Sequence, residues 1–363
     1  MEKRKIQNSL GMFDFLKGLS MILVIFHHSL SIFDLWAHPV FTKYYYRCDS
    51  LIGEGIFYAL FLVGGYNFGK RSVKKHFTLQ CRTMLLPFFY TAVFSVGCHC
   101  VLHFFFFHSV KAAVIESLRL ALSIFLGVPT AEPAPVFGFS LFFAGPLWYI
   151  LASFWAVVLL NIILNHVKET YVPFVLLAVF LVGCAIGDSP RDYFSLGRGL
   201  VVCPLTYIGY RFKKDRLLTS DKGRRITLLL SGLLSLGLAL YLIPRAGNHM
   251  IDLSWMGLVI AVQIFSSAIF AFFLFTIIGT ATGKLADAVC VIGRYSLHVY
   301  LVHSVEYFFP WYLLADLFTA RPLLGALIVT LCRSVIIVVG CALIPRLENM
   351  KNRLLSRASE AKK

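Results

Sequence analysis

Apolar residues occur along the chain in runs of about 20, separated by short polar segments rich in Lys and Arg. An α-helix of that length crosses a hydrocarbon core of about 30 Å and satisfies its own backbone hydrogen bonds. The pattern therefore predicts about ten membrane-spanning helices. We place them approximately at residues 12–33, 50–69, 84–107, 140–164, 171–188, 195–212, 226–244, 253–279, 291–313 and 323–345.

The segments between these runs predict how the spans are oriented. If the N-terminus is cytoplasmic and the spans alternate, about 25 of the 34 Lys and Arg residues lie on the inner side and about 8 on the outer side. Membrane proteins concentrate basic residues on the cytoplasmic side. The fold class that we expect is therefore all-α: a polytopic transmembrane helix bundle of about ten spans, with both termini in the cytoplasm.

Composition favours a single membrane domain. Hydrophobic residues make up 58% of the chain and charged residues 14%, whereas soluble proteins are about 45–50% apolar and about 25% charged. No polar stretch is long enough to fold by itself, so we expect one transmembrane domain at 1–350 and a basic cytoplasmic tail at 351–363. The formal net charge of +16 lies mostly beside the spans, where orientation and anionic membrane lipid explain it without nucleic acid as a partner.

The nine Cys residues fall almost entirely in or beside apolar spans and form no disulfide framework. Cys98 and Cys100 are two residues apart and so face different sides of a helix, which makes them poor metal ligands. We expect no metal site.

The first span carries the most informative polar residues. On a helix, Lys17 and His28 are about 20° from alignment, Asp14 lies on the same face, and His27 is turned about 80° away. The rise from Lys17 to His28 is about 16 Å, which places the histidine near the middle of the membrane. An ionisable residue at that depth indicates a functional site, although a histidine can also simply hydrogen-bond a neighbouring helix.

Later spans contribute further polar candidates. Trp148 is either an interfacial anchor or part of a substrate cavity. His303 and Glu306 lie in the upper part of the ninth span. Arg333 lies inside the tenth span and needs a partner or a water-filled cavity, and Glu306 is a candidate partner.

The chain resembles the acyltransferase 3 family of integral membrane O-acyltransferases. The family's first span has an Asp, then a basic residue before Gly, then a His eleven positions after the basic residue; Asp14, Lys17, Gly18 and His28 match this pattern in FDFLKGLSMILVIFHH. Other segments similar to the family follow in the same order along the chain, from about residue 10 to 345: LFLVGGYNFGKR, CRTMLLPFFY, GPLWYILASF, YIGYRFKK and IGRYSLHVYLVH.

Three positions depart from the family pattern. Lys17 stands where the family often has Arg, and Lys lacks the bidentate fork of a guanidinium. Gly64 replaces the usual Ser at the end of the second span. Glu348 is not matched to the family's acidic-x-Pro-x-Arg ending.

The resemblance implies transfer of an acyl group, by family habit acetyl, from acyl-coenzyme A to a hydroxyl of a sugar, glycan or lipid-linked saccharide. His28 is then the general base, because a neutral imidazole can take the hydroxyl proton. Asp14 is expected to pair with Lys17 or with a base of the second span. The residues expected to hold the phosphates of coenzyme A lie at the inner ends of the first three spans: Lys17, Lys70, Arg71 and Arg82.

The resemblance also implies the setting. Acetyl-coenzyme A is a donor substrate rather than a permanently bound cofactor, the partners are the hydroxyl-bearing acceptor and membrane lipid, and the location is a cell membrane, expected to be a bacterial inner or plasma membrane. His303 matches a family motif, and with Trp148, Glu306 and Arg333 it is expected to support the site on the acceptor side.

Alternatives remain open from the residues alone. Intramembrane charges and an even number of spans also fit a secondary transporter of a small or glycan-related solute, although we find no similarity between two halves of the chain. A scaffold protein would explain the hydropathy but not the alignment of Lys17 with His28. Lys70 and its neighbours can serve as orientation signals alone. The acceptor can be exopolysaccharide, lipid-linked sugar, peptidoglycan or a small amino acid.

Overall fold

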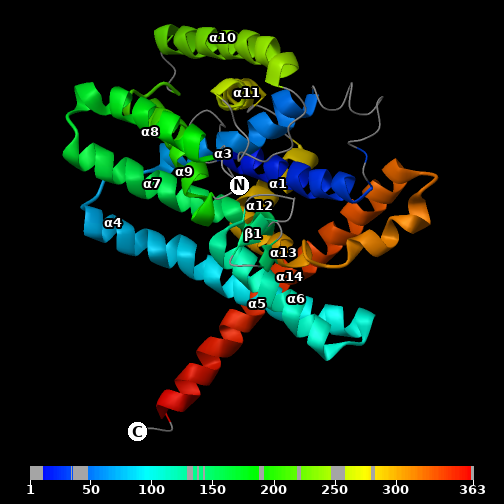
Figure 1. Ribbon diagram of the computed structural model, residues 1–363. Helices are drawn as coiled ribbons and strands as arrows, with labels where there is room; N and C mark the ends of the chain where they lie inside the picture. Colours follow the sequence, from blue (N-terminus) through cyan, green and yellow to red (C-terminus); the bar gives the residue numbers. More distant parts are fainter. Residues whose placement is uncertain are drawn as a thin grey trace.

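A computed structural model describes residues 11–33, 35, 48–128, 134–136, 139–141, 144–187, 192–218, 222–246, 258–278 and 283–360. Nearly all of this part of the chain is helical (Figure 1). Two short strands, β1 (Ala134–Val136) and β2 (Phe139–Leu141), pair as an antiparallel hairpin. The all-α class is confirmed.

The helices follow the chain as α1 (Gly11–Ile32), α3 (Glu54–Asn67), α4 (Val73–Gln80), α5 (Leu86–Phe107), α6 (Val110–Leu126), α7 (Trp148–His166), α8 (Val172–Gly187), α9 (Leu196–Lys214), α10 (Lys222–Ala246), α11 (Leu258–Ile278), α12 (Lys284–Arg294), α13 (Ser296–Glu306) and α14 (Pro322–Glu360). Short π-helical turns precede α3 and α5, namely η3 (Asp49–Gly53) and η4 (Cys81–Leu85). The 3-10 turns are η5 (Gly145–Leu147), η6 (Glu169–Tyr171), η7 (Tyr193–Ser195), η9 (Trp311–Leu314) and η10 (Asp316–Phe318).

Several of these helices are long and apolar enough to cross a membrane. Within the described residues five pass this test, and the bent pair α12 and α13 adds a sixth. The five are Gly11–Ile32, Val73–Phe107, Gly145–His166, Glu169–Ile186 and Pro322–Leu343. Two shorter apolar helices, Leu229–Pro244 and Val259–Leu274, lie in α10 and α11. The chain is therefore a multi-pass helical membrane protein.

Helix α3 lies at the centre of the bundle because its side chains are buried almost all the way round, from Glu54 to Val63. Glycines let its neighbours approach closely. A Cβ atom on Gly65 would collide with the Thr206 carbonyl of α9, and one on Gly55 would meet the Ser267 carbonyl of α11. Small residues at such contacts are typical of helix packing in membranes, where close van der Waals contact replaces the hydrophobic effect between helices.

Aromatic contacts show which helix ends share a side. Phe13 at the start of α1 has its ring 4.9 Å from Tyr66 at the end of α3 and 6.0 Å from Phe272 in the second half of α11. Phe212 at the end of α9 also lies 5.3 Å from Phe272. We call this side of the bundle the basic side, because it carries Lys17, Lys70, Lys214 and Arg294.

The opposite side gathers the other ends of the same helices. Gln263, near the start of α11, donates to the Ser50 carbonyl just before α3 at 3.1 Å. His27, near the end of α1, lies 3.3 Å from Asp49 in η3. The end of α1 thus lies on the same side as the beginnings of α3 and α11, so the consecutive helices α1 and α3 run in opposite directions, as expected of consecutive membrane spans.

The ninth predicted span is not a single helix over 291–313. The chain bends by 73° between α12 and α13, and the first of these helices begins at Lys284, before the predicted span. The physical reason lies in packing: Gly293 of α12 faces the backbone carbonyl of Asp14, and Gly18 of α1 faces that of Val289. This close contact holds α12 along α1, so α13 must turn to continue.

Helix α14 continues to Glu360 and leaves the body of the bundle (Figure 1). Most of the predicted tail at 351–363 is therefore part of this helix, and residues 361–363 lie outside the described part, as do residues 1–10.

Candidate active site

His28 lies near the end of α1 and is partly exposed. Its ring centroid is 5.3 Å from that of His303 on α13 and 5.0 Å from that of Tyr307. Among the described residues no hydrogen bond reaches the His28 imidazole. The sequence predicted His28 as the general base, and the structure places its imidazole beside the rings of His303 and Tyr307.

A series of buried polar contacts lies next to His28. His303 Nδ1 lies 2.5 Å from Glu306 Oε1, and Arg333 Nε of α14 lies 3.3 Å from Glu306 Oε2. Trp311 Nε1 donates to the same carboxylate oxygen at 2.9 Å. The side chains of His303, Glu306 and Arg333 are each at most 2% exposed. The contact between Glu306 and Arg333, suggested by the sequence, is therefore present, and we call His28, His303, Glu306 and Arg333 the histidine site.

This chain of contacts fixes the tautomer of His303. Glu306 pairs with a guanidinium, and an ionised carboxylate only accepts hydrogen bonds, so His303 Nδ1 must carry the proton. His303 Nε2 then has a free lone pair, and it is buried without a hydrogen-bond partner in the described part of the chain. A carboxylate that orients an imidazole through Nδ1 is a common arrangement in proton-transfer sites.

The neighbouring histidine has a different setting. His27 is buried and its Nδ1 lies 3.3 Å from the Asp49 carboxylate. Its ring stands at 89° to that of His28, with centroids 6.1 Å apart. His27 therefore connects α1 to the start of α3, whereas His28 faces α13. This geometry agrees with the helical-wheel argument that separated the two histidines.

At the other end of α1, Asp14 is buried between two cations. Lys17 Nζ lies 2.9 Å from Asp14 Oδ1, and Arg294 Nε of α12 lies 3.4 Å from Asp14 Oδ2. The expected pairing of Asp14 with Lys17 is present, and Arg294 is a second partner that the sequence did not suggest. Asp14 thus joins the two helices whose glycines are already in close contact.

The other predicted phosphate-binding residues are spread along the basic side. The backbone of Arg71 is held by two asparagines of α7: its N–H donates to Asn161 Oδ1 at 3.1 Å, and its carbonyl accepts from Asn165 Nδ2 at 2.9 Å. Lys70 lines a cavity with α7 and α9. Arg82 lies exposed in η4. Lys17 is beside Asp14 and Arg294 instead, so the four do not share one pocket.

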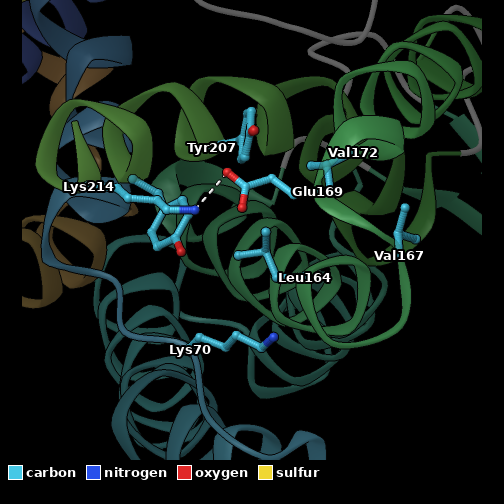
Figure 2. Close-up of a pocket in the computed structure, with 8 residues that line it drawn as sticks. Lys70, Leu164, Val167, Glu169, Val172, Tyr207 and Lys214 are labelled. Atoms are coloured by element: carbon cyan, nitrogen blue, oxygen red, sulfur yellow. Dashed lines mark hydrogen bonds and ion pairs between the residues drawn. The ribbon is translucent and has the colours of Figure 1, made fainter.

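The cavity that Lys70 lines has a volume of about 210 Å³ (Figure 2). Its polar lining includes Glu169 of η6 and Lys214 at the end of α9, joined by a 2.7 Å ion pair, and we call it the Lys214 cavity. The hydrogen bond to Glu169 raises the pKa of the Lys214 ammonium. The remaining lining residues are Leu164, Val167, Val172, Tyr207 and Tyr210.

Trp148 faces a residue that the sequence did not suggest. The guanidinium carbon of Arg198 sits 4.7 Å from the centre of the Trp148 ring, and Arg198 is fully buried. Asp192 Oδ2 lies 3.9 Å from Arg198 Nε, and Asp192 also caps α9 by accepting from the Gly197 N–H at 2.6 Å. An arginine inside an apolar run was the signal used for Arg333, and it would have found Arg198 too.

Three more polar partners were missed for another reason. Asp49, Tyr307 and Trp311 lie just before or after apolar helices. Hydrophobic periodicity marks which face of a helix is buried, but it does not say which residue of a following turn folds back onto that face.

Buried ionisable groups inside a multi-pass helical bundle are typical of membrane proteins with a functional site. A family model described as an acyltransferase domain matches residues 11–344. The chain therefore belongs to the acyltransferase 3 family, and it is a membrane acyltransferase. Searches of curated proteins and of solved structures found no match.

Proposed function

We propose that this protein transfers an acyl group, in the simplest case acetyl, from acyl-coenzyme A to a hydroxyl of a sugar, glycan or lipid-linked saccharide. His28 acts as the general base. One observation carries the proposal: an imidazole without a hydrogen bond among the described residues faces the His303 ring at 5.3 Å, and His303 is itself oriented by a buried carboxylate.

The chemistry needs one proton to move twice. A hydroxyl is a weak nucleophile at neutral pH, so His28 removes its proton as the oxygen attacks the thioester carbonyl. The tetrahedral intermediate collapses, the carbon–sulfur bond breaks, and the imidazolium of His28 returns the proton to the departing thiolate. The products are an ester and free coenzyme A, and the enzyme is unchanged.

The residues behind His28 support this cycle in the proposal. His303 Nε2 offers a lone pair close to His28 and stabilises its imidazolium form during the attack. Glu306 holds His303 in that tautomer, and Arg333 together with Trp311 holds Glu306. These three are positioning residues, because they act on the reacting atoms through His28 or His303.

The donor approaches from the basic side and the acceptor from the opposite side. Lys17, Lys70, Arg71 and Arg82 are the proposed contacts for phosphates, since ammonium and guanidinium groups form charge-assisted bonds with them. The rise of about 16 Å between Lys17 and His28 is crossed by the flexible arm of coenzyme A. In this arrangement about ten spans place both termini and the basic side in the cytoplasm, which the distribution of Lys and Arg favours.

The proposal is tested by replacing the two adjacent histidines separately. Purified protein in detergent is supplied with acetyl-coenzyme A and a hydroxyl acceptor, and release of free thiol is measured. Loss of a general base costs about 10²–10⁴-fold in rate, so His28→Ala should fall by that range. His27→Ala is the matched control and should keep most of the activity, because His27 binds Asp49 rather than facing the site.

Full activity of His28→Ala would exclude this mechanism. If neither the wild type nor the His28→Ala protein binds or turns over acyl-coenzyme A, the result favours a transporter, because a transporter needs no acyl donor. The acceptor class is then identified by comparing acyl esters on glycan, lipid-linked sugar and peptidoglycan fractions from cells with the wild-type and His28→Ala proteins.

A further inference from the structure

The Lys214 cavity lies on the basic side, where three helices meet (Figure 2). The end of α7, the turn η6 that leads into α8, and the end of α9 form its walls. Lys70 lies on the opposite side of the cavity from Tyr207 and Glu169. Ligand pockets for whole small molecules have volumes of about 300–1,000 Å³. A cavity of about 210 Å³ therefore suits one end of a larger ligand.

The backbone on either side of Lys70 is held in place by contacts with α7 and α9. Asn161 and Asn165 of α7 bind the backbone of Arg71, the residue after Lys70. Phe68, two residues before Lys70, is buried, and its ring lies 5.7 Å from that of Tyr210. The backbone on both sides of Lys70 is therefore fixed, and less order has to be created when a ligand binds.

The charges around the cavity leave one cation without a partner. Arg211 is paired with Asp215 through two contacts of 2.9 and 3.2 Å. Glu169 is paired with Lys214 at 2.7 Å and also lies 3.6 Å from Arg211. Lys70 has no ion pair within the described residues. The local balance is thus three cations against two carboxylates, which favours an anionic ligand.

Glu169 is a replaceable counter-ion. Its side chain is 61% exposed, and exposed ion pairs contribute little to stability because water and salt screen them. A phosphate carries more charge than a carboxylate and offers more acceptor oxygens. It can therefore take the place of Glu169 on Lys214 while also reaching Lys70.

We propose that the Lys214 cavity binds the phosphate-bearing nucleotide end of the acyl donor. Lys70 and Lys214 bind the phosphate, Tyr207 and Tyr210 form an aromatic wall, and Glu169 moves aside when the ligand enters. This assignment rests on the proposed use of acyl-coenzyme A as the donor. It adds where the 3′-phosphate of the donor is recognised, at α9 and η6 rather than beside Lys17.

The test compares two donors that differ only in that phosphate. The full-length protein in detergent is supplied with acetyl-coenzyme A or with its analogue lacking the 3′-phosphate, and kcat/KM is measured for both. The wild type should prefer the phosphorylated donor by about tenfold or more, since each charge-assisted phosphate contact is strong. Lys70→Met and Lys214→Met should lose most of this preference, because their kcat/KM for the phosphorylated donor falls towards their value for the dephosphorylated one.

Two further variants sharpen the result. Glu169→Gln removes the competing carboxylate and should lower KM for the phosphorylated donor by about threefold, because Lys214 is then free for the phosphate. Lys75→Met is the matched control: it removes one exposed positive charge from α4, outside the cavity lining, and should keep the full preference.

Equal use of the two donors by the wild type would overturn the proposal. The lipid headgroup is the other source of a phosphate at this depth, so binding to vesicles with and without phosphatidylglycerol is measured in parallel. If Lys214→Met weakens vesicle binding and leaves the donor preference intact, the occupant is lipid and the proposal fails. If neither donor reacts, the proposed enzyme function fails separately from the proposed site. The site is still supported if adenosine 3′,5′-bisphosphate protects the wild type, but not Lys214→Met, against thermal unfolding.

Discussion

The histidine site and the Lys214 cavity both bring acid and base together, but in opposite surroundings. In the first, Glu306 and Arg333 are 1% and 2% exposed and lie 3.3 Å apart. In the second, Glu169 and Lys214 are 61% and 41% exposed and lie 2.7 Å apart. The shorter pair is the weaker one, since water screens it, whereas neither partner of the buried pair can be removed without leaving a charge in an apolar interior.

This difference separates two roles. A buried pair whose members depend on each other holds one geometry, which suits residues that orient a catalytic imidazole. An exposed pair can exchange one partner for a ligand at little cost, which suits the entry of a charged substrate. Breaking the pair of Glu306 with Arg333 should therefore affect folding and turnover. Breaking the pair of Glu169 with Lys214 should change the preference between donors and alter stability only slightly.

Replacing Glu306 should have the largest effect. In Glu306→Leu, Arg333 remains buried without its carboxylate, and losing one partner of a buried pair costs about 3–5 kcal/mol. Thermal unfolding of the purified protein in detergent should show a large fall in midpoint, together with loss of acyl transfer. The double variant Glu306→Leu with Arg333→Met should recover much of the stability but not the activity. A single variant as stable as the wild type would contradict the buried-pair argument.

Replacing Gly293 should have a smaller effect, confined to the histidine site. A Cβ atom at this position would collide with the Asp14 carbonyl, so Gly293→Ala must push α12 away from α1 and shift α13 with it. Overpacking of this kind costs about 1–3 kcal/mol. Acyl transfer should fall while the preference between the two donors stays the same.

Gly64→Ala is the control for this variant. No atom lies within 4 Å of a Cβ built at Gly64 on α3 among the described residues, so alanine there should leave both activity and unfolding unchanged. If Gly293→Ala and Gly64→Ala behave alike, close packing between α1 and α12 does not position the site.

Raising the pH should have the smallest effect, on the exposed pair alone. The hydrogen bond to Glu169 raises the pKa of Lys214, so the folded state holds this proton more tightly than the unfolded state. The stabilisation is complete below the unfolded pKa of about 10.4 and is lost as the pH rises through the higher folded value. The small difference in unfolding midpoint between the wild type and Lys214→Met should be constant from pH 7 to about 10 and vanish as the pH rises through the folded pKa of Lys214. A difference that persists at high pH would show that Lys214 stabilises the fold through packing instead.

Much of the helical arrangement could be predicted because each span is a local feature. Apolar runs mark helices one at a time, and 100° steps along α1 separated His28 from His27 without any knowledge of the partner helices. The pairing of Asp14 with Lys17 was also local, since the two residues are three apart. Glu306 and Arg333 could be matched because two opposite charges in apolar helices need each other.

The rest depended on contacts between distant parts of the chain. Arg294 reaches Asp14 across 280 positions, and Asn161 reaches Arg71 across 90. No periodicity encodes such contacts. The basic residues predicted to hold phosphate were grouped by their nearness to span ends, yet packing placed Lys70 with Lys214 and Lys17 with Arg294. The bend between α12 and α13 could not be predicted, because the role of Gly293 depends on the close approach of α1, which the sequence does not show.

The central position of α3 has a consequence for how the protein is made. This helix carries the buried Glu54, and an ionisable side chain inside a span makes its insertion into the bilayer costly. When it leaves the ribosome, its later neighbours α9 and α11 have not yet been synthesised. Its final surroundings therefore form only after about 200 further residues have been added, and until then the insertion machinery or the first helix must shield it.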